Sequence, residues 1–433
     1  MPLTRGQFLC AAAGAAFAQP ALRIDAARLR THIETLSLHG RPPGGRFEDG
    51  VSRLGYSDAD LAGRALLMRL ITLAGAQPRI DAAGNLFARR SGADPSLPPL
   101  LIGSHIDSVP SGGNFDGDLG SLASIEILHL LHTRNITTRR SLEAVVWACE
   151  EATFAGRSLN GSRAAAGKLE PGELEHTSGG LKKSEAIRRI GGRPDRIEEA
   201  RIAPGAYHAY LELHIEQGGT LEKEKLPIGV VDGIVAVDRY EVEVEGFANH
   251  AGTTPMPERQ DALIAASKLV LAVRHAVTGE PGRQVGTVGH FEVHPNAPNV
   301  IPGRVRHSIE LRDLSAEKLL RIAERIREQA ARIAAESGVR IKLENKVHHE
   351  AALATPAIQD VIQSSAKSLG LPTMHMPSGA GHDAQMMAQL FPMGMIFVPS
   401  RGGISHSPRE FTDWADCARG ADVLLQSVMA LTA

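Results

Sequence analysis

Strand-like and helix-like hydrophobic patterns alternate along the first half of the chain. Apolar runs of strand length stand at residues 100–102 and 142–148, and apolar positions with helical spacing cover residues 61–74 and 119–133. Residues 79–87 have a strand pattern around an Ala-Gly-Asn turn. Such alternation predicts the α/β class, with a mostly parallel sheet and helices on both faces.

The pattern changes after residue 228. Residues 240–244 alternate strictly between polar and apolar side chains, which is typical of a sheet with one face in water. Helix-like and strand-like segments then follow in the order βαββαβ, which predicts a ferredoxin-like α+β unit. These segments are a helix at 261–276, strands at 285–293 and 304–312, a helix at 316–337 and a strand at 339–344.

The alternation of helix-like and strand-like patterns returns near the C-terminus, with a helix expected at 356–369 and an apolar strand at 395–398. The simplest architecture is one catalytic α/β domain that a smaller domain interrupts in sequence. We therefore expect residues 21–227 and 347–433 to form the catalytic domain, and residues 228–346 to form the insertion.

Composition narrows the function classes. A chain of 433 residues exceeds the size at which one hydrophobic core usually stops growing. The 47 Lys and Arg nearly balance the 49 Asp and Glu, so no basic field favours nucleic acid or an acidic membrane as a partner. The 3 cysteines form no CxxC pair, so a catalytic metal would need His and carboxylate ligands.

The N-terminus departs from globular composition. Arg5 precedes a short apolar stretch, residues 8–18, which ends in an Ala-x-Ala pattern. These features are typical of a secretory signal peptide, and the stretch is too short to span a bilayer. We expect residues 1–18 to be a signal peptide and the protein to be periplasmic; the alternative is an N-terminal extension on a cytoplasmic protein.

Side chains of metal-ligand type follow several predicted strands. In an open α/β sheet, ligands bind beside the carboxyl ends of the strands, so groups far apart in sequence can converge there. Imidazole nitrogens and carboxylate oxygens suit a pair of divalent ions such as zinc, manganese or cobalt. The candidate side chains are His105, Asp107, Asp116, Glu150, Glu151, His214, Gln217 and His406.

Each of these groups also has an ordinary structural explanation. A single histidine at a strand end is more often a satisfied surface or core residue than a ligand. Adjacent glutamates usually belong to a solvated face. Glu150 and Glu151, however, directly follow an apolar strand, where like charges are costly without a cation to offset them.

Longer blocks of sequence resemble the hydantoinase/carbamoylase branch of the M20 metallohydrolases, from about residue 45 to the C-terminus. The most specific blocks are Asn249-His-Ala-Gly-Thr-Thr-Pro-Met256, Pro295-Asn-Ala-Pro-Asn299 and Ser378-Gly-Ala-Gly-His-Asp-Ala-Gln385. The resemblance implies hydrolysis of a carbamoyl or ureido C–N bond, with N-carbamoyl-L-amino acids as the first expectation. Allantoate or ureidoglycolate is the alternative substrate, and a dipeptidase or aminopeptidase of the same architecture is a further alternative.

The resemblance also implies roles for the candidate residues. Two divalent ions would share Asp116, with zinc expected first and manganese, cobalt or nickel possible. Glu150 would be the general base for the attacking water, and Asp107 would orient His105 through its other ring nitrogen. The implied ligands are His105, Asp116 and His214 for one ion, and Asp116, Glu151 and His406 for the other.

The inserted domain would supply most of the substrate contacts. By the same resemblance, His250 and Asn299 would support the developing oxyanion, Arg312 would grip a carboxylate and Gln217 would contact the carbamoyl end. The ordinary alternatives are a surface pair between Arg312 and its neighbour Asp313, and a loop-capping role for His250. The family also uses this domain to form a homodimer, so these contacts can serve the partner's site.

One position departs from the family pattern. Phe154 occupies the place where the family often has arginine after the paired glutamates. The predicted metal ligands are unaffected by this change. Substrate preference, or the order of the loop near the second ion, is therefore the property that we expect to differ.

Overall fold

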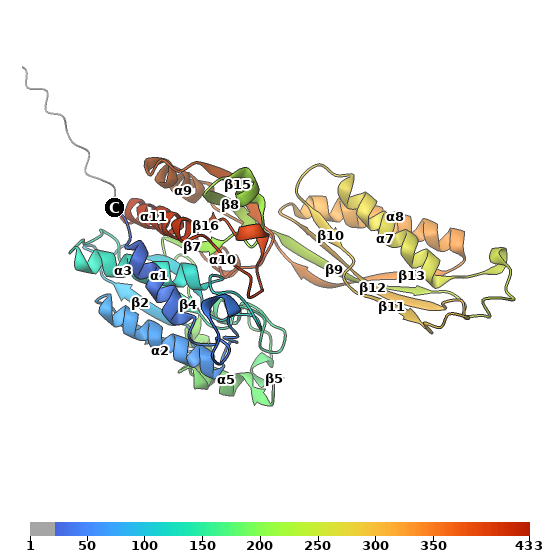
Figure 1. The fold of residues 1–433 in the computed structure, drawn as a ribbon, viewed down its shortest axis with the longest axis horizontal. Helices are drawn as coiled ribbons and strands as arrows, with labels where there is room; N and C mark the ends of the chain where they lie inside the picture. Colours follow the sequence, from blue (N-terminus) through green and yellow to red (C-terminus); the bar gives the residue numbers. More distant parts are fainter. Residues whose placement is uncertain (1–21) are drawn as a thin grey trace, which may run out of the picture.

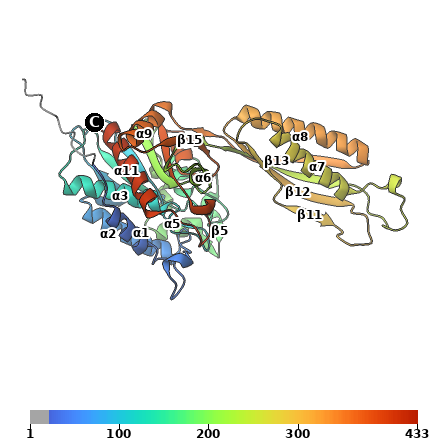
Figure 2. The ribbon, with the colours of Figure 1, turned by 45° about the horizontal axis from the view of Figure 1, so that its top comes forward.

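The computed structural model describes residues 22–433, which form two lobes (Figure 1). The larger lobe contains both ends of the described chain, and the smaller lobe extends from it as a separate layer of sheet and helices (Figure 2). The predicted signal peptide, residues 1–18, lies outside the described residues. Among residues 22–433, no helix combines the length and apolar character needed to cross a membrane.

A nine-stranded sheet forms the centre of the larger lobe. The order is β1-β2-β4-β3-β7-β16-β8-β14, and β15 also pairs with β8. The strands are β1 (Gln77–Ile80), β2 (Leu86–Arg90), β3 (Leu100–His105), β4 (Leu142–Trp147), β7 (Ala209–Ile215), β8 (Ile228–Ile234), β14 (Ala352–Leu353), β15 (Thr373–Ser378) and β16 (Met393–Val398). The central pairs β4-β3, β3-β7 and β7-β16 are parallel, which confirms the predicted class, whereas β1, β2 and β14 pair antiparallel.

Helices cover both faces of this sheet, as predicted. Leu100 and Ile102 of β3 point into one hydrophobic core, while Leu101 between them points into another. The first core is built with the long helices α1 (Ala26–Leu36), α2 (Asp58–Leu73), α3 (Asp118–Thr133), α9 (Pro356–Ser368) and α11 (Trp414–Leu431). Shorter helices complete the lobe: α4 (Asn160–Ala165), α5 (Lys183–Arg189), α6 (Thr220–Glu224) and α10 (Ala384–Met387), beside the small β5–β6 hairpin (Thr177–Ser178, Leu181–Lys182).

The smaller lobe follows the predicted βαββαβ order, except that the second strand is broken into two. Its elements are β9 (Ala236–Glu245), α7 (Ala262–Thr278), β10 (Val285–Thr287), β11 (Phe291–His294), β12 (Arg304–Asp313), α8 (Ala316–Ser337) and β13 (Arg340–His349). The sheet order is β10-β12-β9-β13, with β11 also on β12, and all pairs are antiparallel. The helices cover one face, and the other face is charged and exposed, as the strict alternation predicts.

Two details differ from the sequence prediction. The strand expected at 285–293 is broken into β10 and β11, which both pair with β12. The smaller sheet also begins at Ala236 rather than near 228, because β8 pairs with β15 and β16 in the larger sheet. Only Val235 separates β8 from β9, so no loop marks this boundary.

Candidate metal centre

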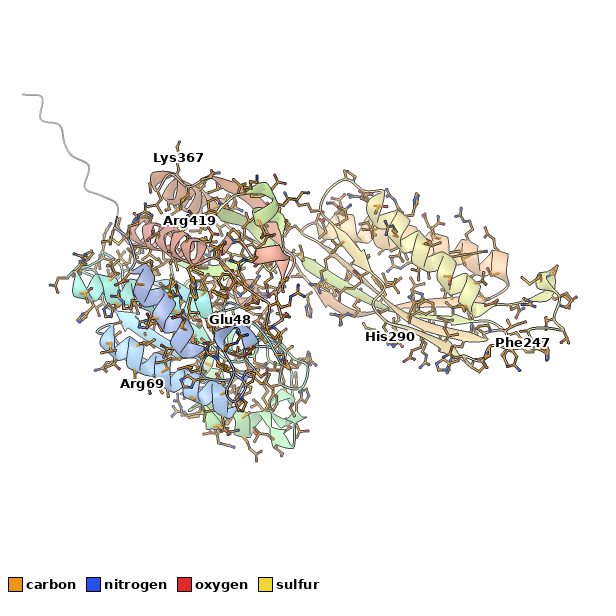
Figure 3. The ribbon with its side chains drawn as sticks, viewed as in Figure 1. Glu48, Arg69, Phe247, His290, Lys367 and Arg419 are labelled. Carbon is orange, nitrogen blue, oxygen red and sulfur yellow. The ribbon has the colours of Figure 1, made fainter. Side chains whose placement is uncertain are left out.

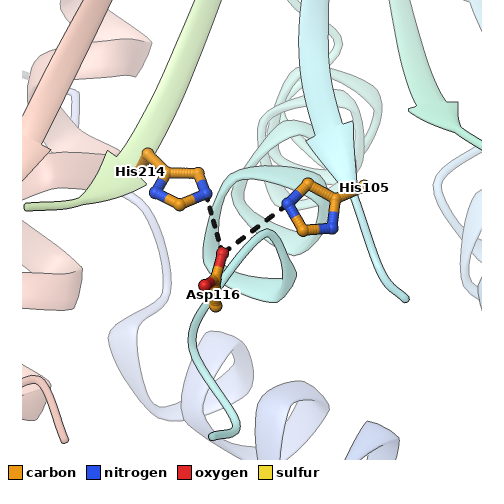
Figure 4. Close-up of side chains that lie close together, drawn as sticks. All are labelled: His105, Asp116 and His214. Atoms are coloured by element: carbon orange, nitrogen blue, oxygen red, sulfur yellow. Dashed lines mark ion pairs between the residues drawn. The ribbon is translucent and has the colours of Figure 1, made fainter. Parts of the chain in front are cut away.

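Three imidazoles converge on the carboxylate of Asp116. The Nε2 atoms of His105 and His214 lie 3.6 and 3.1 Å from its Oδ1 atom (Figure 4). The Nε2 atom of His406 lies 3.3 Å from Oδ2 and 3.4 Å from a carboxylate oxygen of Glu151. Each oxygen of Asp116 thus faces its own group of donors, and the two groups share this aspartate.

Strand ends and loops bring these side chains together. His105 ends β3 and His214 lies in the neighbouring parallel strand β7, so both stand at the same edge of the sheet. Asp116 immediately precedes the turn into α3, and His406 follows β16 in a Gly- and Ser-rich loop. His406 has a φ of 52°, a conformation that is uncommon outside glycine and clusters at functional sites.

Backbone carbonyls fix the orientation of the two buried imidazoles. The Nδ1 atom of His105 lies 3.0 Å from the carbonyl of Asp107, and that of His214 lies 3.0 Å from the carbonyl of Ile215. Because Nδ1–H donates there, loss of the Nε2 proton leaves a lone pair on the side of Asp116, which is the tautomer that a metal ion requires. Asp107 is thus the residue that orients His105, as expected, but through its main chain, because its carboxylate lies 3.7 Å from Nδ1.

The carboxylate of Asp107 instead supports the paired glutamates. Its two oxygens accept the backbone N–H groups of Glu150 at 3.0 Å and Glu151 at 3.1 Å. Asp107 is fully buried, and this burial raises its pKa to about 6. It ties the turn after β3 to the turn after β4, so that both glutamates stay at the strand end.

The buried charges fit a divalent cation. Burial, followed by neighbouring carboxylates, raises the pKa of Glu150 and of Glu151 well above their usual range. Burial also opposes ionisation of Asp116, but hydrogen bonds with His214 and His406 hold its pKa well below the usual value. One buried oxygen of Glu151 has no hydrogen-bond partner among the described residues. A cation at these donors would offset the repulsion and satisfy that oxygen.

Gln217 lies inside the same cluster. Its amide nitrogen donates to Asp116 at 2.7 Å and lies 3.4 Å from both Ser405 and His406. Its amide oxygen is buried without a partner among the described residues, and its φ is 57°. The left-handed backbone of Gln217 thus places its side-chain amide against the shared aspartate.

Two further residues at the centre had no predicted role. Glu410 accepts the backbone N–H groups of Phe115 and Asp116 at 3.0 and 3.1 Å and the hydroxyl of Ser405 at 2.8 Å. Burial raises its pKa to about 7. It braces two ligand loops, and its position four residues after His406 is the only signal of this in the sequence.

The second of these residues, His382, packs edge-on against His214, with ring centroids 4.4 Å apart. Its Nε2 atom lies 2.8 Å from the hydroxyl of Ser378. Both residues belong to a sequence block that the family resemblance highlighted, although no role was assigned to them. Burial holds the pKa of His382 well below its usual value, so the ring is neutral beside the cluster.

His250 and Asn299 lie on the smaller lobe, away from the metal-ligand cluster. They occupy neighbouring loops, because the N–H of Ala251 donates to the carbonyl of Asn299 at 3.0 Å. Phe247 opens the first loop and stands at the end of the smaller lobe farthest from the larger lobe (Figure 3). The Nδ1 atom of His250 accepts the N–H groups of Gly252 and Thr253, so in the neutral ring Nε2 carries the proton and can donate.

Arg312 lies at the opposite end of the smaller lobe, next to the larger one. Its guanidinium donates to Glu310 at 2.9 Å and to the carbonyl of Gly379 at 2.6 Å. The expected alternative, a pair with Asp313, is not the arrangement found, because adjacent residues of a strand point to opposite faces. The structure thus separates Arg312 from His250 and Asn299.

Phe154 does not line the metal centre. It is 5% exposed and its ring packs edge-on against Tyr56 with centroids 5.4 Å apart. Cys149 and Ile190 belong to the same apolar cluster. The aromatic ring therefore holds the loop that follows Glu150 against this apolar cluster.

Comparison with known proteins shows that the chain is similar to hydrolases. The model of the family described as "Peptidase family M20/M25/M40" matches residues 101–430. An N-carbamoyl-L-amino acid amidohydrolase from Geobacillus stearothermophilus is 38% identical over 94% of this chain and 99% of that protein. A ureidoglycolate hydrolase from Arabidopsis thaliana is also 38% identical, over 95% of this chain and 87% of that protein.

Solved structures show the same similarity. A hydantoinase/carbamoylase family amidase from Burkholderia multivorans is 36% identical, with a TM-score of 0.88 over 95% of this chain and 99% of that one. A dinuclear metal-binding M20 peptidase from Bacillus subtilis shares 16% identity and a TM-score of 0.62 over 94% of this chain and 98% of that one, which shows likeness of fold.

Proposed function

The chain belongs to peptidase family M20/M25/M40, among its hydantoinase/carbamoylase amidases, and from this premise we propose that it hydrolyses an N-carbamoyl-L-amino acid. Water cleaves the carbamoyl C–N bond, and the products are the amino acid, ammonia and carbon dioxide. The observation that carries the proposal is the convergence of three imidazoles, Asp116 and Glu151 beside Glu150, at the carboxyl ends of parallel strands.

Two divalent cations per subunit fit the donor set. His105, Asp116 and His214 would hold one ion, and Asp116, Glu151 and His406 would hold the other. Zinc is the first candidate, with manganese, cobalt or nickel as alternatives, since these donors accept all four. Cations there would polarise the carbamoyl carbonyl and make a nearby water more acidic.

Glu150 is the proposed general base. Its carboxylate is buried beside the ligand cluster but belongs to neither group of ligands. It takes a proton from the attacking water as the oxygen adds to the carbamoyl carbon, and passes it to the leaving nitrogen as the C–N bond breaks. Asp107 keeps this glutamate in place through the backbone N–H bond described above.

Ureidoglycolate is a second candidate substrate, and allantoate is a third. The Arabidopsis ureidoglycolate hydrolase matches this chain as closely in identity as the Geobacillus carbamoyl-amino-acid hydrolase does. Both reactions cleave a linear ureido C–N bond next to a carboxylate-bearing carbon. They therefore need the same base and cations, and differ in the part of the site that contacts the rest of the substrate.

We further propose that the chain acts as a homodimer in which the smaller lobe completes the partner's site. Ile264 and Leu271 are exposed on α7, and Val285 is exposed on the neighbouring edge strand β10. Exposed apolar side chains beside a free strand edge are typical of a surface that a partner covers. Association there would let the distal His250 and Asn299 reach the partner's metal centre, where His250 Nε2–H could donate to the oxyanion.

Export of the protein is a separate proposal, which rests on the sequence of residues 1–18 alone. The other proposals do not depend on it. Fractionation of cells that produce the full chain, followed by N-terminal sequencing, tests it. A mature N-terminus near residue 19 in the periplasmic fraction is the expected result, and intact chain in the cytoplasm would contradict it.

The activity is tested with purified protein and a substrate panel. The panel contains N-carbamoyl-L-amino acids, N-carbamoyl-β-alanine, allantoate, ureidoglycolate and a dipeptide, each with manganese or zinc and then with a chelator. Chelator-sensitive release of ammonia from one ureido compound is expected. Turnover of the dipeptide alone would move the chain to the peptidases. Glu150→Gln should abolish turnover while metal content stays unchanged, and full activity in that variant would overturn the mechanism.

Mixing two inactive variants tests the shared site. Glu150→Gln lacks the base, and His250→Ala lacks the donor that we place in the partner's site. A mixed dimer contains one site with both groups, so equal mixing and subunit exchange should restore about a quarter of wild-type activity. Activity that stays at background while mixed dimers form would contradict the shared site.

A further inference from the structure

A cavity separate from the metal-ligand cluster lies in the larger lobe, between α2, the β1–β2 hairpin and α5. Its volume is about 270 Å³, and none of the metal-ligand residues lines it. Apolar side chains from all three elements form most of the wall: Leu61, Met68, Ile80, Leu86 and Ile190. Two arginines, Arg64 and Arg189, complete it.

Arg64 is a buried cation without a hydrogen-bonded carboxylate. It is 5% exposed, and one of its terminal nitrogens donates to the carbonyl of Gly84. Its Nε–H has no hydrogen-bond partner among the described residues, and the nearest oxygen of Asp60 is 3.8 Å away. Arg64 and Asp60 thus form a buried ion pair that leaves Nε–H without a hydrogen bond, and a buried unsatisfied donor is costly unless a ligand supplies an acceptor.

Arg189 adds a second charge, on a side chain that is 39% exposed. It pairs with Asp58, whose side chain is 92% exposed. An exposed ion pair of this kind contributes little free energy, so Arg189 can exchange this partner for a ligand at small cost. No acidic residue lines the cavity.

We propose that this cavity binds a small monocarboxylate with an aliphatic tail. The tail would lie against the apolar wall and the carboxylate would meet the guanidinium groups. The two arginines and the absence of a lining acid disfavour a ligand that carries an ammonium group. A free amino acid should therefore bind more weakly, although it shares the tail and the carboxylate.

The cavity lies directly behind the segment that carries the catalytic base. Leu86 of its wall pairs with Val146 in β4, and Glu150 follows that strand. Ile190 of its wall packs in the same cluster as Cys149 and Phe154. A ligand here would be an effector that touches the support of the active site, and the proposal does not depend on which ureido substrate the enzyme uses.

Calorimetric titration of the metal-loaded protein with 4-methylpentanoate tests the proposal. Met68→Trp fills the cavity, and Leu73→Trp is its control on the same helix at a side chain that is 66% exposed. Arg189→Ala removes the rim charge, and Arg188→Ala is its control at the adjacent exposed position. Circular dichroism and turnover verify that each variant is folded.

Saturable binding is expected in the wild type and in both controls. Loss of one charge-assisted hydrogen bond should weaken binding about tenfold in Arg189→Ala, and Met68→Trp should abolish it. Leucine and 4-methylpentan-1-ol should bind at least about tenfold more weakly than the acid. The proposal fails if the wild type shows no saturable binding, or if leucine binds as well as the acid. It also fails if Arg189→Ala binds the acid like the wild type, because the acid would then bind in the catalytic site instead of this cavity.

Discussion

Arg53 joins the two turns that carry metal ligands, and its replacement is a sharp test of how the centre is held. The side chain is 1% exposed. Its guanidinium donates to the carbonyls of Leu36, His39 and Ile106 at 3.1, 2.8 and 2.6 Å, and to the carboxylate of Asp118. The Ile106 carbonyl directly follows the first ligand strand, and Asp118 opens α3 just after the shared aspartate.

Arg53→Met keeps most of the apolar length and removes every donor. Asp118 is then a buried carboxylate without its cation, and three carbonyls lose a partner. Breaking a buried ion pair from one side costs about 3–5 kcal/mol, so we expect the free energy of unfolding of the larger lobe to fall by about this amount. Metal affinity should fall as well, because both ligand turns lose a common anchor.

Urea unfolding followed by tryptophan fluorescence measures this loss. Both tryptophans of the chain, Trp147 and Trp414, lie in the larger lobe, so the signal reports that lobe. The double variant R53M/D118N removes the orphaned charge and should be more stable than R53M. Arg134→Met, at an exposed position, is the control and should change stability by less than about 0.5 kcal/mol. A loss below about 1 kcal/mol in R53M would refute the reasoning.

Three further results are expected. Asp107→Asn keeps only one acceptor oxygen for the backbone N–H groups of Glu150 and Glu151, so kcat should fall about ten- to a hundredfold; unchanged kcat contradicts this role. A chelator should lower the midpoint of thermal unfolding, because the buried carboxylates lose their counter-charge; an unchanged midpoint argues against bound cations. Burial favours the neutral acid at Glu173, but cationic neighbours led by Arg163 lower its pKa from 4.5 to about 2. This stability is present above pH 4.5 and is lost towards pH 2, so the advantage of wild type over Glu173→Gln should shrink in that range; a constant advantage would contradict it.

The sequence predicted which side chains meet at the metal centre, because topology alone constrains them. His105, His214 and Glu151 each stand at or just beyond the end of a strand of the central sheet, and parallel strands end at one edge. The predicted partner of His105, Asp107, is the residue found at Nδ1, but the contacting atom could not be predicted. Whether its Nδ1 atom meets the carboxylate or the carbonyl of Asp107 depends on a difference of 0.7 Å, between 3.7 and 3.0 Å. The rotamer of one side chain decides this, and sequence periodicity carries no information about it.

The boundary between the lobes was missed for a related reason. Hydrophobic period identifies a strand, but not the sheet that it joins. Residues 228–245 form two strands with only Val235 between them, and the first belongs to the larger sheet. Turn residues usually mark a change of element, and none separates β8 from β9. The ferredoxin-like order was predicted correctly because the periods of its helices and strands differ clearly.

The positions of the three proposed substrate contacts on the smaller lobe bear on the homodimer that we propose. Strand β12 starts at Arg304, beside the loops of His250 and Asn299, and reaches Arg312 at the larger lobe. Eight steps along an extended strand span about 27 Å, which is longer than any substrate in the panel. One molecule cannot touch both ends of this strand. Arg312 therefore stands beside the larger lobe of its own chain, and the homodimer that we propose would bring His250 and Asn299 to the partner's site.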